Sequence, residues 1–181
     1  EALVANRANY VSDILAAQAA IDIMEYLPKA YENGKDMKAR EMMLQASMVA
    51  GMAFTNVSLG IVHSMAHTLG GVFHVSHGLA DAVLLPYVIR YNESDQRAKK
   101  IYDDFAKKIG ACDLGSAVEE LNKTLQIPTC LKEIIPDESG FVEKLDEMAL
   151  LAKADGCTKT NPVIPDEKEI KELFMKAYKG E

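Results

Sequence analysis

The sequence predicts an all-α protein built from many helices. Apolar residues recur at helical spacing along almost the whole chain, and no segment shows a convincing strand alternation. Residues that cap helices precede these segments, and glycine or proline follows several of them. Nine methionines and no tryptophan favour an adaptable helical core over a β-sandwich. We therefore expect a multi-helix, bundle-like domain.

The first two helices are expected to form a hairpin. Ser12 or Asp13 can cap a first helix that runs to about residue 27, because Pro28 falls near its end. Residues 31–34, Tyr-Glu-Asn-Gly, predict a turn, since Asn-Gly accepts positive φ. The second helix is expected over residues 36–53.

The middle of the chain alternates breaks and helices. A break over residues 54–60 precedes a helix over 61–69, which Gly70-Gly71 is expected to stop. A short loop then carries His74 and His77. A strongly apolar helix follows over residues 78–92, and Pro86 within it predicts a kink or an early break.

Five further segments complete the expected fold. Ser94 or Asp95 caps a helix that runs to about residue 109, where Gly110 closes it. The other helical segments are expected over residues 115–125, 131–135 (a short turn or helix), 139 or 141 to 154, and 166–178.

Composition argues against several classes of function. The chain has 181 residues, which fits one domain, and a net charge of −7 without a basic stripe argues against nucleic acid as a partner. No run of eighteen apolar residues predicts a membrane span. Cys112, Cys130 and Cys157 are odd in number and widely spaced, which predicts reduced thiols and a cytoplasmic location.

All four histidines lie within residues 63–77. His63 and His67 are one helical turn apart on one face, and a turn at Gly70-Gly71 can bring His77 back to them. Imidazole is a common ligand of zinc and iron, so the cluster predicts a metal or active site. The alternative is that these are ordinary polar residues near a helix end. No nearby carboxylate obviously completes the site, and Ser64 breaks the HExxH pattern.

The central motif resembles a known family. Residues 60–71 read Gly-Ile-Val-His-Ser-Met-Ala-His-Thr-Leu-Gly-Gly, and residues 77–86 read His-Gly-Leu-Ala-Asp-Ala-Val-Leu-Leu-Pro. Together with residues 26–34, 50–56 and 155–162, they closely resemble iron-containing (group III) alcohol dehydrogenases.

The resemblance implies the helical C-terminal domain of the dehydroquinate synthase-like fold. Residues 1–181 would be its metal- and substrate-binding domain, and the domain that binds NAD or NADP would be absent from this chain. The complete enzyme would interconvert a primary alcohol and an aldehyde by hydride transfer, with Fe²⁺, or alternatively Zn²⁺, as Lewis acid. The 181 residues alone are expected to be inactive, since they contain no Gly-x-Gly-x-x-Gly phosphate cradle.

Five positions take site roles by resemblance. His63 and His77 match metal ligands, and His67 matches a catalytic histidine that faces the nicotinamide and the substrate. Phe54 matches a position lining the substrate cleft, with plain core packing as the alternative. Cys157 matches a residue near the substrate pocket in some relatives, with a buried, inert thiol as the alternative.

The remaining ligands, one departure at Asp81 and the fourth histidine complete the comparison. The family's other Asp and His ligands lie in an Asp-Ala-x-x-His segment, which we expect just before the position of Glu1. Asp81 replaces a common Asn and is expected to be solvated instead of a partner of the site, and His74 is expected beside the ligands or at the surface.

Two other functions compete with this interpretation. The chain could be a stand-alone helical metal-binding or interaction protein, or part of a zinc-dependent enzyme related to glycerol dehydrogenase. An isolated domain would expose an apolar face, so we also expect a homo-oligomer.

Overall fold

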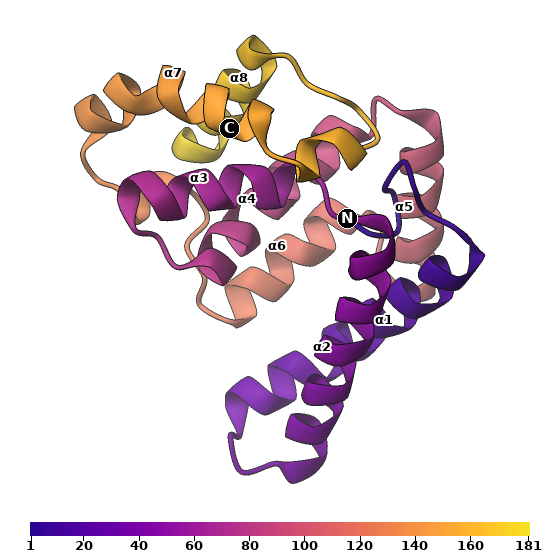
Figure 1. Cartoon of the computed structure of the whole chain (residues 1–181). Helices are drawn as coiled ribbons and strands as arrows, with labels where there is room; N and C mark the ends of the chain where they lie inside the picture. Colours follow the sequence, from indigo (N-terminus) through magenta and orange to yellow (C-terminus); the bar gives the residue numbers. More distant parts are fainter.

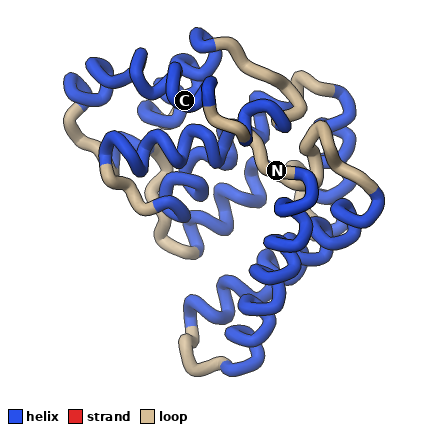
Figure 2. The backbone as a smooth tube through the Cα atoms, in the orientation of Figure 1, coloured by secondary structure: helices blue, strands red, loops and turns tan.

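The structure is a computed structural model that describes all residues 1–181, and every regular element in it is helical (Figure 2). This confirms the predicted all-α class. The elements in chain order are α1 (Tyr10–Glu32), α2 (Met37–Val57), α3 (Ile61–Phe73), α4 (His77–Asn92), α5 (Gln96–Lys108), α6 (Leu114–Thr124), the 3-10 helix η1 (Leu131–Glu133), α7 (Glu138–Ala154), the 3-10 helix η2 (Cys157–Thr160) and α8 (Glu167–Lys179).

The helices form a body and a projecting hairpin (Figure 1). In the body, α3 packs against α4 and α7, and α8 packs on α7 and α4. The helix α6 lies against α4 and α5. The helices α1 and α2 pack along each other, and the turn that joins them points away from the body.

The body is held by one large apolar cluster drawn mainly from α3, α4, α7 and α8. Met65 and Leu69 of α3 are fully buried in it. Phe141 stacks on Tyr178 with ring centroids 4.2 Å apart, which ties α7 to α8. Because one side of α3 is buried in this cluster, its other side is free to carry the histidines toward solvent.

Helix caps follow the expected chemistry. Asp36, Asp95 and Asp166 accept backbone N–H groups at the starts of α2, α5 and α8, so these starts match the sequence prediction. The start of α1 differs, because Asn9 caps it instead of Ser12 or Asp13. Ser12 takes the reciprocal position in the capping box.

Two predicted ends are wrong at the histidine segment. Gly70-Gly71 do not stop α3, which continues to Phe73 and ends where His74 takes a left-handed conformation with φ 56°. His77 is the first residue of α4 and not part of a loop, so the connection is three residues long. A short connection holds the two histidine-bearing helices at a fixed separation.

Two other helices also extend beyond their predicted ends, and a third is unbroken at its proline. The helix α1 continues past Pro28, and α2 continues past Phe54 to its end at Val57. Pro86 does not break α4. A proline frees the carbonyl four residues before it, and here the Ala82 carbonyl accepts a hydrogen bond from the Asn122 side chain at 2.7 Å. That bond from α6 replaces the missing helical one.

No single helix has both the length and the apolar composition needed to cross a membrane. The helices α2 and α3 meet that test only as a pair bent by 103°.

Candidate metal and substrate site

Three of the four histidines meet at one place between α3 and α4. The rings of His63 and His77 have centroids 5.1 Å apart, and the His67 ring stacks on that of His77 at 5.2 Å. His63 is the most enclosed, with 24% of its side chain exposed, against 48% for His67 and 51% for His77. His74 is exposed at the end of α3 and belongs to no such contact.

Asp81 joins this cluster, so the expectation that it is solvated is wrong. Its Oδ2 lies 3.2 Å from the Nε2 of His77 and 3.7 Å from the Nε2 of His63. His77 and Asp81 are one turn apart on α4, a spacing that places both side chains on one face. Burial raises the pKa of the Asp81 carboxyl, and the two nearby histidines only partly oppose that effect.

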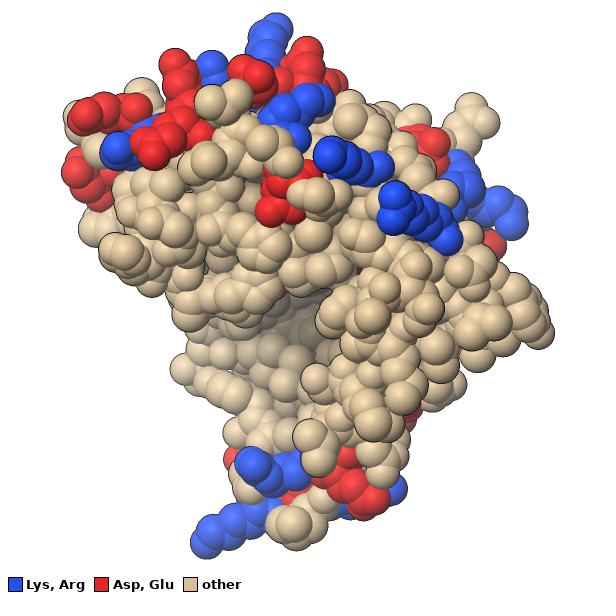
Figure 3. All heavy atoms as spheres, in the orientation of Figure 1, with Lys and Arg blue, Asp and Glu red and all other residues tan.

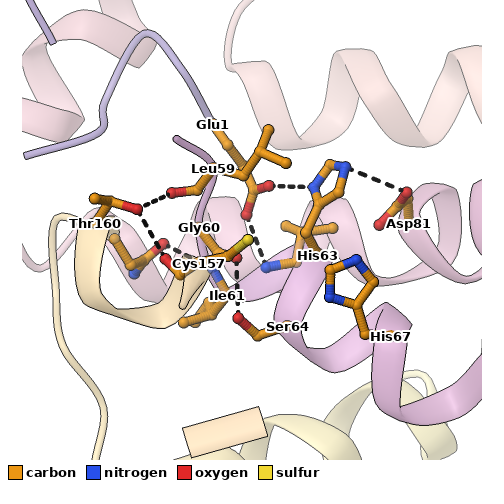
Figure 4. Close-up of polar contacts among 12 residues, drawn as sticks. Glu1, Leu59, Gly60, Ile61, His63, Ser64, His67, Asp81, Cys157 and Thr160 are labelled. Atoms are coloured by element: carbon orange, nitrogen blue, oxygen red, sulfur yellow. Dashed lines mark hydrogen bonds and ion pairs between the residues drawn. The ribbon is translucent and has the colours of Figure 1, made fainter. Parts of the chain in front are cut away.

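Glu1 brings a second carboxylate to the site, although Glu1 was not among the residues expected there. Its Oε2 lies 2.5 Å from the Nδ1 of His63, and Figure 4 shows His63 between Glu1 and Asp81. Burial would raise the pKa of the Glu1 carboxyl, but its hydrogen bonds with His63 and with the Val62 N–H help to lower it overall. Burial would likewise lower the pKa of His63, yet the bond to Glu1 raises it.

Glu1 also helps to begin α3. Gly60, the N-cap residue, has no side chain, and two distant side chains accept the first N–H groups in its place. Asn161 Oδ1 accepts the N–H of Ile61 at 3.2 Å, and Glu1 Oε1 accepts that of Val62 at 2.8 Å. A negative charge is favourable at a helix start, so the same carboxylate stabilises the helix and holds its histidine.

Residues 1–5 read Glu-Ala-Leu-Val-Ala. Ala5 is buried beside Ala2, Ala53 and Val57, so this segment packs against α2. The expected location of the Asp-Ala-x-x-His segment, just before Glu1, stays a prediction.

His67 is held by a third carboxylate. Its Nδ1 lies 2.9 Å from Asp155 Oδ2, while the other oxygen of Asp155 accepts the Cys157 N–H at 2.7 Å. Burial would raise the pKa of Asp155, but the bonds from Cys157 and His67 lower it overall. Because Asp155 engages Nδ1, the Nε2 of His67 is left to meet a ligand.

An apolar cleft opens beside the histidines. Its volume is 540 Å³, and His63, Asp81 and Glu1 are its polar lining residues. Phe54 lines it and is 38% exposed. Alanines form much of the wall: Ala16, Ala19, Ala20, Ala50, Ala53 and Ala82. Figure 3 shows a hollow between the body and the hairpin whose visible surface belongs mostly to residues other than Lys, Arg, Asp and Glu.

Cys157 lies elsewhere in the site region. It begins η2 and is not among the residues that line the cleft, whereas Phe54 is. Burial, with the nearby charge of Asp155, raises the pKa of the Cys157 thiol to about 11. The surroundings therefore match the inert-thiol alternative better than a substrate contact.

The donor set fits a divalent metal ion. His63, His77 and Asp81 each offer one ligand atom, and these three atoms lie within 4.8 Å of one another. Two imidazoles and one carboxylate suit Fe²⁺ and Zn²⁺. Glu1 occupies the other ring nitrogen of His63, as outer carboxylates do for ligating histidines in metal sites.

Comparison with known proteins places this geometry in a family. The model of the Fe-containing alcohol dehydrogenase family, C-terminal part, matches residues 1–178. The NADPH-dependent butanol dehydrogenase of Clostridium saccharobutylicum is 43% identical over 99% of this chain and 48% of its own length. The 1-propanol dehydrogenase PduQ of Citrobacter freundii is 37% identical over 96% of this chain and 50% of its own length.

Solved structures agree with the sequence comparison. The iron-containing alcohol dehydrogenase of Thermococcus thioreducens superposes with a TM-score of 0.93 at 38% identity, over 100% of this chain and 47% of that one. A 1,3-propanediol oxidoreductase gives a TM-score of 0.89 at 36% identity, over 98% and 48%. The chain thus spans about half the length of these relatives.

Proposed function

The chain belongs to the iron-containing alcohol dehydrogenase family, as its C-terminal domain, and we propose that it supplies the metal and substrate site of an NAD(P)-linked alcohol dehydrogenase. The reaction would interconvert a primary alcohol and an aldehyde. The observation that carries the proposal is the meeting of His63, His77 and Asp81 beside an apolar cleft that His63 and Asp81 help to line.

The nucleotide would be bound outside these residues. The relatives named above are about twice as long as this chain, and one of them is named as NADPH-dependent. Residues 1–181 would then form one domain that binds metal and substrate, with a second domain presenting NAD or NADP to the cleft.

His63 and His77 would hold the metal ion, Fe²⁺ or alternatively Zn²⁺. The bound ion would act as a Lewis acid that polarises the substrate oxygen. Each histidine must offer a neutral nitrogen, and Glu1 leaves the Nε2 of His63 free for that purpose.

His67 would face the nicotinamide and relay the proton of the alcohol. Asp155 fixes its Nδ1, so its Nε2 is the atom that exchanges the proton. Phe54 and the alanines of the cleft would take the aliphatic part of the substrate by apolar contact. Cys157 would affect the pocket only indirectly. Its backbone N–H donates to Asp155, and Asp155 in turn holds His67.

The surface of the hairpin supports the proposal of a homo-oligomer. Met37, Leu44 and Met48 of α2 are 57–74% exposed, which is unusual for side chains that face water permanently. Sedimentation velocity over a range of concentrations tests this, and a constant monomer would contradict it. The three cysteines are unpaired, which supports a cytoplasmic location.

The test of the function uses the protein that contains this chain together with its nucleotide-binding part. Metal-loaded protein should reduce NAD⁺ or NADP⁺ with 1-propanol or 1-butanol, and His77→Ala should lose bound metal and activity together. Full metal content in His77→Ala would refute the ligand assignment. The 181 residues alone should be inactive, and metal-dependent NADH formation by them would refute the two-domain proposal.

A further inference from the structure

We propose that Asp81 is a third protein ligand of the metal ion, so that this chain completes a two-histidine, one-carboxylate site from α3 and α4 alone. The inference rests on the proposed metal site of His63 and His77.

The geometry places the Asp81 carboxylate between the two histidines. Its Oδ2 lies 3.2 Å from the Nε2 of His77 and 3.7 Å from the Nε2 of His63. Ligand atoms around one ion of about 2.1 Å bond length are separated by roughly 3–4 Å, since the bonds diverge at tetrahedral or octahedral angles. Both distances from Asp81 fall in the range that a shared ion would require, and the three ligand atoms all lie within 4.8 Å of one another.

The second oxygen of Asp81 has no partner. Its Oδ1 is buried and accepts no hydrogen bond. Burying a carboxylate oxygen without a donor or a cation is unfavourable, so a group that satisfies it is expected. A divalent ion between Asp81 and the histidines would satisfy the carboxylate and use the free nitrogens at once.

Asp81 is the carboxylate that remains free for an ion. Glu1 also reaches His63, but its Oε2 is committed to the Nδ1 of that ring. Asp81 lies one turn after His77 on α4, so this helix offers a nitrogen and a carboxylate oxygen from one face.

The experiment is a Co²⁺ and Zn²⁺ titration of the chain against a chromophoric chelator, with no substrate or nucleotide present. Wild type should bind one equivalent. Asp81→Asn, which keeps the shape and removes the charge, should bind at least tenfold more weakly, and the visible Co²⁺ spectrum should change. Asp155→Asn is the matched control, because it removes one charge from the same region without touching His63 or His77. Its Co²⁺ spectrum should stay unchanged.

The outcomes separate this inference from the proposed function. If His63→Ala and His77→Ala lose the metal while Asp81→Asn binds as wild type does, Asp81 is not a ligand and the function stands. If Asp81→Asn and Asp155→Asn weaken binding equally with unchanged spectra, Asp81 acts only through its charge, and the inference falls. If wild type binds no metal, both the inference and the proposed metal site fall.

A second variant covers the case in which Asp81→Asn does not fold. Asp81→Glu keeps the charge and lengthens the side chain by one methylene. A ligand displaced in this way should alter the Co²⁺ spectrum while binding persists. An unchanged spectrum and affinity would overturn the assignment.

Discussion

The carboxylate of Glu1 contacts two consecutive residues of α3, Val62 and His63. One oxygen lies 2.5 Å from the Nδ1 of His63, and the other accepts the Val62 N–H at 2.8 Å. The residue that stabilises the start of α3 thus also sets the orientation of the imidazole on its first turn. Helix stability and ligand geometry are coupled at this point.

Removing the Glu1 carboxylate should lower both the stability of the protein and its affinity for metal. Glu1→Ala leaves the Val62 N–H without its acceptor, so we expect a loss of about 1–2 kcal/mol in unfolding free energy. Metal affinity should fall about tenfold or more because the His63 ring is no longer held. Urea unfolding and Co²⁺ titration measure the two effects. Asp104→Ala on α5, an exposed site, is the control, and equal behaviour of the two variants would contradict the prediction.

Gly60→Ala should disrupt the same junction by crowding. A Cβ at Gly60 would lie 2.5 Å from Asn161 Oδ1 and 2.7 Å from Glu1 Oε1, closer than contact allows. Both acceptors must move, so thermal unfolding should show a loss of about 1–3 kcal/mol. Gly71→Ala is the matched control within α3. Its Cβ meets nothing within 4 Å, and it should gain about 0.5–1 kcal/mol. Equal stabilities would show that the junction is adaptable.

The carboxylate of Asp155 should give a pH-dependent contribution to stability. Its pKa is lower in the folded protein, so its contribution is fully present above the ordinary carboxyl pKa and is lost as pH falls through the folded pKa. The difference in urea stability between wild type and Asp155→Asn should therefore be constant near pH 6 and shrink below about pH 4. A difference that does not vary with pH would point to packing alone.

Cys157 should react slowly with alkylating agents. Burial and the charge of Asp155 raise the pKa of its thiol to about 11, so very little thiolate is present at pH 8. Iodoacetamide labelling followed by peptide mass spectrometry should modify the exposed Cys112 first, with Cys157 about a hundredfold slower. Comparable rates would mean that the surroundings of Cys157 open readily in solution.

The sequence predicted the helices well wherever the signal was local. Asp36, Asp95 and Asp166 cap helices because a short side chain reaches N–H groups only two or three residues away. The prediction failed at Gly70-Gly71, and of the two alternatives at Pro86 the early break does not occur, because tertiary contacts decide at both places. Buried neighbours carry α3 past the glycines, and Asn122 satisfies the carbonyl that Pro86 frees.

The site residues divide in the same way: those close together in the sequence could be predicted, and those far apart could not. His63, His67 and His77 could be grouped from their spacing, and the structure brings them together. Glu1 and Asp155 could not be found in this way, because they reach the site from 62 and 88 residues away. Asp81 could have been predicted locally, because it lies four residues after His77 and therefore on the same helix face.

The alanines that line the cleft set how large a molecule it can hold, independently of the proposed metal ligands. Space beside His63 exists because small side chains on three helices leave it empty, and no polar group there fixes its length. Enlarging one of them, for example Ala50→Leu on α2, removes room for several methylenes while every ligand stays in place. Single substitutions in this wall would therefore change the size of molecule that the cleft accepts, while the proposed metal ligands stay in place.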